Sequence, residues 1–346
     1  MSRVLASNYP TPIILTTILS TAVFVYYFVK RNFGYAKEYV KVGKVSKLVV
    51  HPIKSCRGVE VDQVTITKTG VKYGTFRDRA WVVIDKDGKM VNLAKVPQLI
   101  TIKTSFEDDR FLVLGNKLSE TIKIDVRINV REDDKVIHTN VYGGDIDGID
   151  CGDDVANFLS RSVGVEGLRL IQHVEELDTR PSRSSGHRTA DVEARYRVLY
   201  QNYSNIHLTT EKSLSELNQR IVKNSGRDKV VSSDHFRANI VVGASKAWDE
   251  DHWAQLRFVD SKGLESQVSL YQLQNCERCI QTTVSRDSAK KLSEPLKTLR
   301  TFRKPTHPDD IKRLGERPLF GCIFATDNEG VIKRGDDILA LRLKRI

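Results

Sequence analysis

The chain has 346 residues, of which 40% are hydrophobic and 29% are charged; this excludes disordered and fibrous proteins, and the length predicts roughly two domains of about 150 residues each. Five cysteines are too few for a small disulfide scaffold and indicate a reducing compartment. With 55 Lys and Arg against 44 Asp and Glu the net charge is +11, which favours an anionic partner: phosphate, nucleic acid or a membrane surface.

The first informative segment is an uncharged run at residues 11–29, TPIILTTILSTAVFVYYFV. A helix of this length, at about 1.5 Å per residue, nearly spans a hydrocarbon core of roughly 30 Å. Its last aromatic residues are followed by Lys30 and Arg31, which is typical of a helix leaving a bilayer, whereas a cleaved signal peptide would end in small residues. Because the flanking basic residues lie mostly after the run, the rest of the chain is expected in the cytosol. Residues 1–41 are therefore predicted to be a membrane anchor, with a helix at about 11–29, and a linker.

The remainder is predicted to be a β-rich α+β chain with few helices. Alternating or continuous apolar runs indicate strands, Asp-Gly and Gly-Asn pairs indicate hairpin turns, and acidic residues before helically spaced apolar ones indicate a helix start. The expected strands and hairpins lie at 42–52, 79–91, 111–126, 239–242, 268–273 and 331–343, and the expected helices begin at Asp153 and Glu211. The polar stretch 179–188 is the candidate domain boundary. Regular strand–helix alternation and a Gly-rich nucleotide loop are both missing from the sequence, which argues against a Rossmann fold.

Cys276 and Cys279 form a CxxC motif, in the run NCERCIQTTV, for which three interpretations are open. A zinc site needs two further ligands, and the other cysteines form no second pair. A thioredoxin-like motif needs a helix after its first cysteine, but the flanking residues, IQTTV included, are predicted to be strands. The third interpretation is a pair of structural cysteines at a strand end. Arg278 and Arg286 nearby favour a thiolate, the form that binds metal.

Basic residues beside Ser and Asn at predicted strand ends are the second signal. They occur in the segments Lys54–Gly58, Arg77–Arg79 and Phe236–Asn239. Such groups can hold a phosphate or a planar heterocycle through several hydrogen bonds. The alternative is that each is a solvated charge or a surface ion pair.

Four motifs in order make the chain recognisable. They are HPIKSCRG at 51–58, GxxxGxxRDRAW at 70–81, FRANIVV at 236–242 and CxRCxxTTV at 276–284. Together they resemble the MOSC family of molybdenum-cofactor proteins and, with the N-terminal anchor, the amidoxime-reducing components of animal mitochondria within it. The resemblance implies one transmembrane helix, a β-rich N-terminal MOSC region at 42–178, and a MOSC domain at 190–346 with a β-barrel-like core and flanking helices.

The same resemblance implies the roles of individual residues. Cys279 matches the catalytic cysteine whose thiolate binds molybdenum. The positions that would hold the pterin and its phosphate are Lys54, Ser55, Arg79, Ser204, Arg237, Asn239 and Arg278, with Thr210 and Thr282 as neighbours of the cofactor. The sequence departs from the family pattern at Ala238, where relatives often have Pro, and at Ser285, where they often have Asp; the second departure bears on substrate preference.

The function implied is a molybdenum-cofactor-dependent reductase of N-hydroxylated compounds such as amidoximes and hydroxylamines. No haem, flavin or nicotinamide motif occurs in the sequence, so electrons would come from cytochrome b5 and its NADH-dependent reductase. The implied location is the mitochondrial outer membrane, or another intracellular membrane, with the body facing the cytosol.

One alternative is a molybdenum-cofactor-binding or sulfur-handling MOSC protein without reductase activity. Another is a basic membrane adaptor or nucleic-acid binder, but that requires a contiguous Lys/Arg stripe, and the basic residues are spread along the chain, so no nucleic-acid partner is expected.

Overall fold

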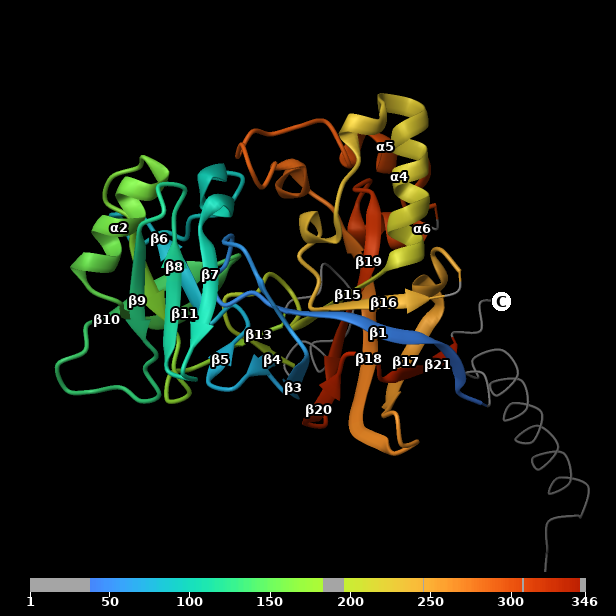
Figure 1. Ribbon diagram of the computed structural model, residues 1–346, viewed down its shortest axis with the longest axis horizontal. Helices are drawn as coiled ribbons and strands as arrows, with labels where there is room; N and C mark the ends of the chain where they lie inside the picture. Colours follow the sequence, from blue (N-terminus) through green and yellow to red (C-terminus); the bar gives the residue numbers. More distant parts are fainter. Residues whose placement is uncertain (1–37, 183–195, 245, 307, 343–346) are drawn as a thin grey trace, which may run out of the picture.

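The structure is a computed structural model that describes residues 38–182, 196–244, 246–306 and 308–342. Two lobes lie side by side (Figure 1), one built around β6–β11 and α2, the other around β15–β19, β21 and β1. The expected membrane-spanning helix at 11–29 lies outside the described residues. Among the described helices, none has the length and apolar character needed to cross a membrane.

The strands run in chain order as β1 (Val40–Val50), β2 (Val59–Val61), β3 (Gln63–Thr67), β4 (Gly70–Tyr73), β5 (Phe76–Arg77), β6 (Trp81–Ile84), β7 (Lys103–Glu107), β8 (Phe111–Gly115), β9 (Thr121–Asp125), β10 (Val136–Val141), β11 (Gly144–Asp150), β12 (Arg169–Gln172), β13 (Arg180–Pro181), β14 (Arg197–Val198), β15 (Ile206–Thr210), β16 (Ile240–Ala244), β17 (Trp253–Val259), β18 (Glu265–Glu277), β19 (Leu319–Thr326), β20 (Gly330–Lys333) and β21 (Asp337–Arg342). The α-helices are α2 (Asp153–Val163), α4 (Glu211–Ser225), α5 (Leu296–Phe302) and α6 (Pro308–Leu314), and the 3-10 helices are η1 (Pro97–Thr101), η2 (Arg227–Lys229), η3 (Ser233–His235), η4 (Asp249–His252) and η5 (Ile280–Thr283).

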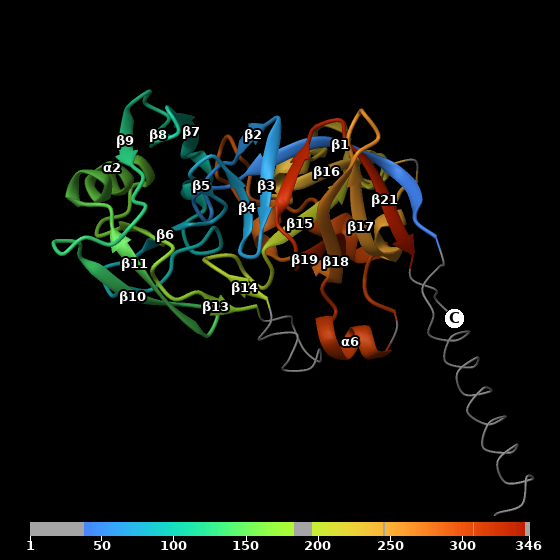
Figure 2. The ribbon, with the colours of Figure 1, turned by 90° about the horizontal axis from the view of Figure 1, so that it is seen from below.

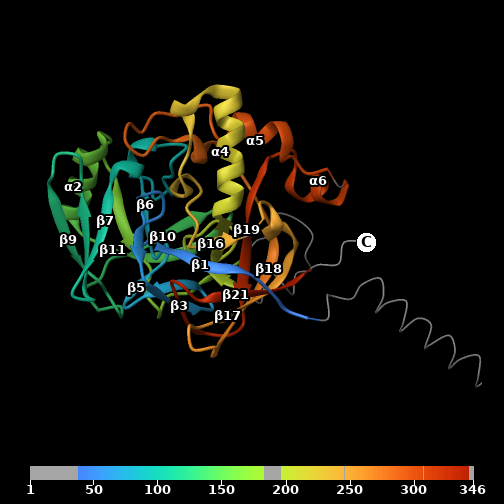
Figure 3. The same cartoon turned by 45° about the vertical axis from the view of Figure 1, so that its right-hand side comes forward.

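The second lobe is a closed barrel. Its sheet has the strand order β16-β15-β19-β18-β17-β21-β1-β2, and β1 also pairs with β16, so the sheet returns on itself. Inward-facing apolar residues from every strand fill the interior, among them Leu48, Phe258 and Phe324, all buried. Helix α4 packs against β16 and α5 on the outside (Figure 3). The expected β-rich fold with a barrel and few helices is confirmed, and the barrel takes its strand β1 from the N-terminal part of the chain.

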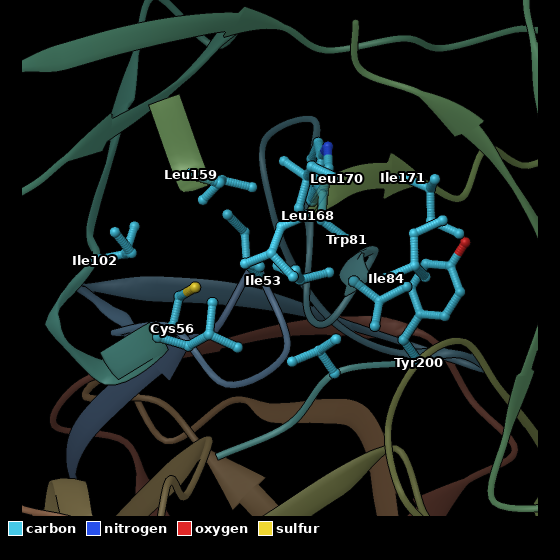
Figure 4. Packing of buried hydrophobic residues seen from close by; sticks show 14 of the residues in the cluster. Ile53, Cys56, Trp81, Ile84, Ile102, Leu159, Leu168, Leu170, Ile171 and Tyr200 are labelled. Carbon is cyan, nitrogen blue, oxygen red and sulfur yellow. The ribbon is translucent and has the colours of Figure 1, made fainter. Parts of the chain in front are cut away.

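The first lobe contains two sheets, β10-β11-β12-β6 and β7-β8-β9, packed around their own core. Figure 4 shows this core, in which Trp81, Leu159 and Leu170 meet Ile53 from the segment after β1. A further sheet, β20-β3-β4-β5, lies between the two lobes when the molecule is seen from below (Figure 2). Because β20 comes from the C-terminal part and β3 from the N-terminal part, this sheet joins the lobes through backbone hydrogen bonds.

Helices α2 and α4 begin where the sequence predicted. Helix α2 buries Val155, Phe158 and Leu159 and ends at Gly164, which has φ +70°, a conformation that costs glycine little. The Thr210 side chain accepts a hydrogen bond from the Ser213 backbone N–H at 3.2 Å, so Thr210 is the N-cap of α4.

Three expectations need correction or completion. IQTT forms the 3-10 helix η5 instead of a strand. The single strand expected at 331–343 is divided into β20 and β21, because the chain turns at Gly335 with φ +96°, in the region that favours glycine. The candidate boundary at 179–188 lies mainly outside the described residues, although Arg180–Pro181 form β13, paired with β14.

Candidate functional site

One cavity brings the predicted site residues together. All eight line it: Lys54, Ser55, Arg79, Ser204, Arg237, Asn239, Arg278 and Cys279. Its volume of about 160 Å³ is several times the share of one water molecule, roughly 30 Å³, so it can hold an organic ligand. Of the two expected neighbours, Thr282 lines the cavity, whereas the structure does not place Thr210 in its wall; the Thr210 hydroxyl caps α4 instead.

Lys54 and Ser55 lie in the tight connection that follows β1. The connection is fixed by the Lys54 N–H, which donates to the Trp81 carbonyl at 2.8 Å. The Lys54 ammonium donates to the Tyr200 carbonyl at 2.7 Å and to Asn202 Oδ1 at 2.5 Å. Ser55 has φ +77°, an unusual conformation for a non-glycine residue. Its buried hydroxyl has no hydrogen-bond partner among the described residues.

Asp78 holds together a second part of the cavity wall. Its buried carboxylate accepts hydrogen bonds from the His51 N–H at 2.8 Å, from Asn239 Nδ2 at 2.8 Å and from Arg79 at 2.5 Å. Arg79 also donates to the Arg237 carbonyl at 2.9 Å. One carboxylate therefore positions two predicted site residues, Arg79 and Asn239, on different segments.

The two remaining arginines are held by neutral acceptors. Arg237 donates to the backbone carbonyls of Cys56 and Ile53. Arg278 donates through Nε to the Phe320 carbonyl at 2.9 Å and contacts Nε2 of His207. Neither guanidinium forms an ion pair with a carboxylate in the part of the chain that the structure describes.

Cys279 is the residue before η5, at the end of the long strand β18. Thr282 donates to its carbonyl through both the backbone N–H, at 3.1 Å, and the hydroxyl, at 2.9 Å, which fixes the turn. Cys276 also lines the cavity, and burial raises the pKa of its thiol to about 11. Within the described ranges no three His, Cys, Asp or Glu side chains form a group able to hold a metal ion, so the zinc interpretation of the CxxC motif finds no support there.

The cavity concentrates positive charge. Burial lowers the pKa of Lys54 well below its usual range, and Arg180 and Arg79 lower it further. Burial, and next the charge of Arg79, lower the pKa of Arg237 to about 9. Both shifts come first from burial and then from neighbouring cations, so the charged forms of Lys54 and Arg237 are disfavoured until an anion offsets them. Buried cations, the free Ser55 hydroxyl and a cysteine in one cavity match the donor set that a phosphorylated pterin bound to a thiolate-ligated metal requires.

Several site residues escaped the sequence analysis. Gln281 lines the cavity, and Asp78 holds Arg79 and Asn239 from behind it. His207, which the sequence places near the candidate cofactor positions as a structural histidine, also lines the cavity. Asp78 stands within the RDR run, where a single acid between two arginines was the available signal. Ser285, by contrast, caps a turn, because its hydroxyl accepts from the Ser288 N–H at 3.3 Å, and the structure does not place it in the cavity wall.

Comparison with known proteins identifies the domains of the chain. The MOSC N-terminal beta barrel domain matches residues 42–166, and the MOSC domain matches residues 195–339. The chain therefore belongs to the family of MOSC-domain proteins. Within it, the chain is 32% identical over 306 residues to mitochondrial amidoxime reducing component 2 of Bos taurus, covering 88% of this chain and 85% of that protein. It is also 32% identical over 303 residues to mitochondrial amidoxime-reducing component 1 of Homo sapiens, covering 87% and 84%.

Proposed function

We propose that this chain is a molybdenum-cofactor-dependent reductase of N-hydroxylated compounds. The observation that carries the proposal is the convergence of the Cys279 thiol and four cationic side chains on one cavity. Its homologues are named for amidoxime reduction. The overall reaction adds two electrons and two protons to an N–OH group and releases an amine or amidine and water.

The residues of the chain have separate tasks in this proposal. Lys54, Arg237 and Arg278 neutralise the cofactor phosphate, and Arg79 and Asn239, held by Asp78, meet the polar edge of the pterin. Cys279 provides the thiolate ligand. When bound, the cofactor supplies the two-electron chemistry that the side chains lack. On the same wall Gln281 and Tyr203 offer an amide and a hydroxyl to the substrate.

The proposal extends to partners and location. Cytochrome b5 and its NADH-dependent reductase are the proposed electron donors, and small amidoximes and hydroxylamines the proposed substrates. We propose that residues 11–29 anchor the chain in the mitochondrial outer membrane, since the homologues carry mitochondrial names. A shared surface would raise the effective concentration of enzyme and donor. Protease added to intact organelles should remove the body, and a fully protected body would contradict this orientation.

The decisive experiment compares Cys279→Ser with Cys276→Ser. Serine stays protonated and is a harder, weaker ligand, so Cys279→Ser should abolish NADH-coupled turnover of benzamidoxime with cytochrome b5 and its reductase. Cys276→Ser is the matched control, and it should keep most activity and molybdenum. Equal loss in both variants would contradict a single thiolate ligand. Stoichiometric molybdenum without turnover in the wild type would favour the alternative, a cofactor-binding or sulfur-handling protein.

A further inference from the structure

Unusual backbone conformations gather at this site. Among the described residues, Ser55, Arg79 and Arg237 have positive φ values of 77°, 51° and 55°, and all three line the cavity. Such conformations cost free energy in non-glycine residues and concentrate at functional sites. Tyr142 shares this feature, with φ +52°, although its sequence carries no motif that marks it.

Tyr142 lies at the tip of the β10–β11 hairpin. Val141 pairs with Gly144, so Tyr142 and Gly143 form a two-residue turn, and both have positive φ. Turns of this kind favour Asn-Gly, and a bulky aromatic residue at the first position is unfavourable. The turn is held by the Gly143 N–H, which donates to Asn140 Oδ1 at 2.7 Å. Turn formation therefore does not explain the tyrosine.

The side chain of Tyr142 contacts three separate parts of the cavity wall. Its ring lies 5.2 Å from the Lys54 ammonium, in a cation–π arrangement. The ring centroid is 5.9 Å from that of Tyr203. The hydroxyl interacts with the side chains of Gln281, in η5 two residues after Cys279, and of Asn92, and both interactions lower its pKa against the larger effect of burial. Lys54, Tyr203 and Gln281 all line the cavity, and they come from the segments after β1, before β15 and after β18.

We infer that Tyr142 is a positioning residue, by which the hairpin of the first lobe holds Lys54 for anion binding and Gln281 for substrate binding. The two roles use different parts of the side chain. The ring acts on Lys54, and the hydroxyl acts on Gln281. The substrate half of the inference rests on the proposed function, whereas the anion half needs only the apo-protein.

Two substitutions separate these roles. Tyr142→Asn suits the turn, so the hairpin should fold, but the ring is lost. The apo-variant should bind inorganic phosphate about fivefold more weakly by calorimetry, because the cation–π contact no longer holds Lys54, and it should retain less molybdenum. Tyr142→Phe keeps the ring and should bind phosphate as the wild type does. Its kcat/KM for benzamidoxime should fall about threefold to tenfold, the effect of one lost hydrogen bond.

Ser119→Gly is the matched control. Ser119 also has a positive φ, of 63°, in the exposed connection between β8 and β9, so this change relieves similar strain away from the cavity. It should leave phosphate binding, molybdenum content and turnover unchanged. Wild-type phosphate affinity in Tyr142→Asn would overturn the inference, and so would the same losses in Ser119→Gly. A wild-type chain without turnover would refute the proposed function instead, while the phosphate measurement still decides the role of Tyr142 toward Lys54.

Discussion

Asp78→Asn tests how the cavity is held together. The substitution keeps the size of the side chain but removes the carboxylate that pairs with Arg79 at 2.5 Å, the one ion pair of Arg79 among the described residues. The Asp78 side chain is 0% exposed and that of Arg79 is 13% exposed, so the pair is largely shielded from solvent. Breaking a buried ion pair costs about 3–5 kcal/mol, a large part of the roughly 5–15 kcal/mol that stabilises a typical domain.

The assay is guanidinium-induced unfolding of the body of the chain, followed by fluorescence and by circular dichroism. Asp125→Asn is the control, because the Asp125 carboxylate pairs with Arg110 at 2.7 Å with both side chains about half exposed. Exposed pairs contribute less than about 1 kcal/mol. If Asp78→Asn cost no more than Asp125→Asn, the interpretation of Asp78 as the organiser of the cavity would be wrong.

Three other changes test different parts of the structure. Gly321→Ala should lower the unfolding temperature by several degrees in a thermal melt, because Gly321 has φ +70° and an added Cβ would lie 2.5 Å from the Leu208 carbonyl oxygen; an unchanged melting temperature would contradict this geometry. Burial raises the pKa of Glu250 from 4.5 to about 7, so between these pH values the folded state binds a proton that the unfolded state releases. The free energy of unfolding of the wild type should therefore fall by up to roughly 3 kcal/mol as pH rises from 4.5 through 7. Unfolding curves of Glu250→Gln should not show that loss, and parallel pH profiles would refute the assignment. Arg237→Ala removes a charge-assisted contact of about 1.5–3 kcal/mol, so molybdenum content after gel filtration should fall while circular dichroism stays unchanged; full metal content would remove Arg237 from the proposed cofactor site.

The sequence predicted the elements that depend on local pattern. The helix at Glu211 follows from the apolar spacing of Leu214, Leu217 and Ile221, whereas the role of Thr210 as its cap is visible only in the structure. The IQTT run misled the prediction because its β-branched residues favour strands, whereas tertiary structure sets a 3-10 turn in which the Thr282 and Thr283 hydroxyls donate to the carbonyls three residues earlier. The local sequence pattern does not distinguish a strand from a 3-10 helix here, because the same side chains are compatible with both conformations.

The site could be predicted as a set of residues but not as a network. Motif resemblance named eight of the residues that line the cavity, and the structure brings these eight together. Asp78 and Tyr142 act through residues distant in sequence: Asp78 reaches Asn239, 161 positions away. A single sequence without pairing information cannot show such long-range contacts. The tyrosine was missed for a further reason, because its strain exists only in the folded turn.

The closure of the barrel by β1 also sets the order in which the chain can fold. Val40 pairs with Ala340, so strand β1 needs a partner that is made about 300 residues later in the chain. At roughly 5–20 residues per second, translation of the intervening chain takes on the order of 15–60 s. The β16 edge of β1 stays open for about two-thirds of that time, and the β21 edge stays open for all of it; unpaired edges are templates for aggregation. Pairing over such a distance also makes folding slow. We therefore expect the exposed edges of β1 to need shielding, to which the neighbouring β2 contributes along Leu48–Val50, until β21 has been made.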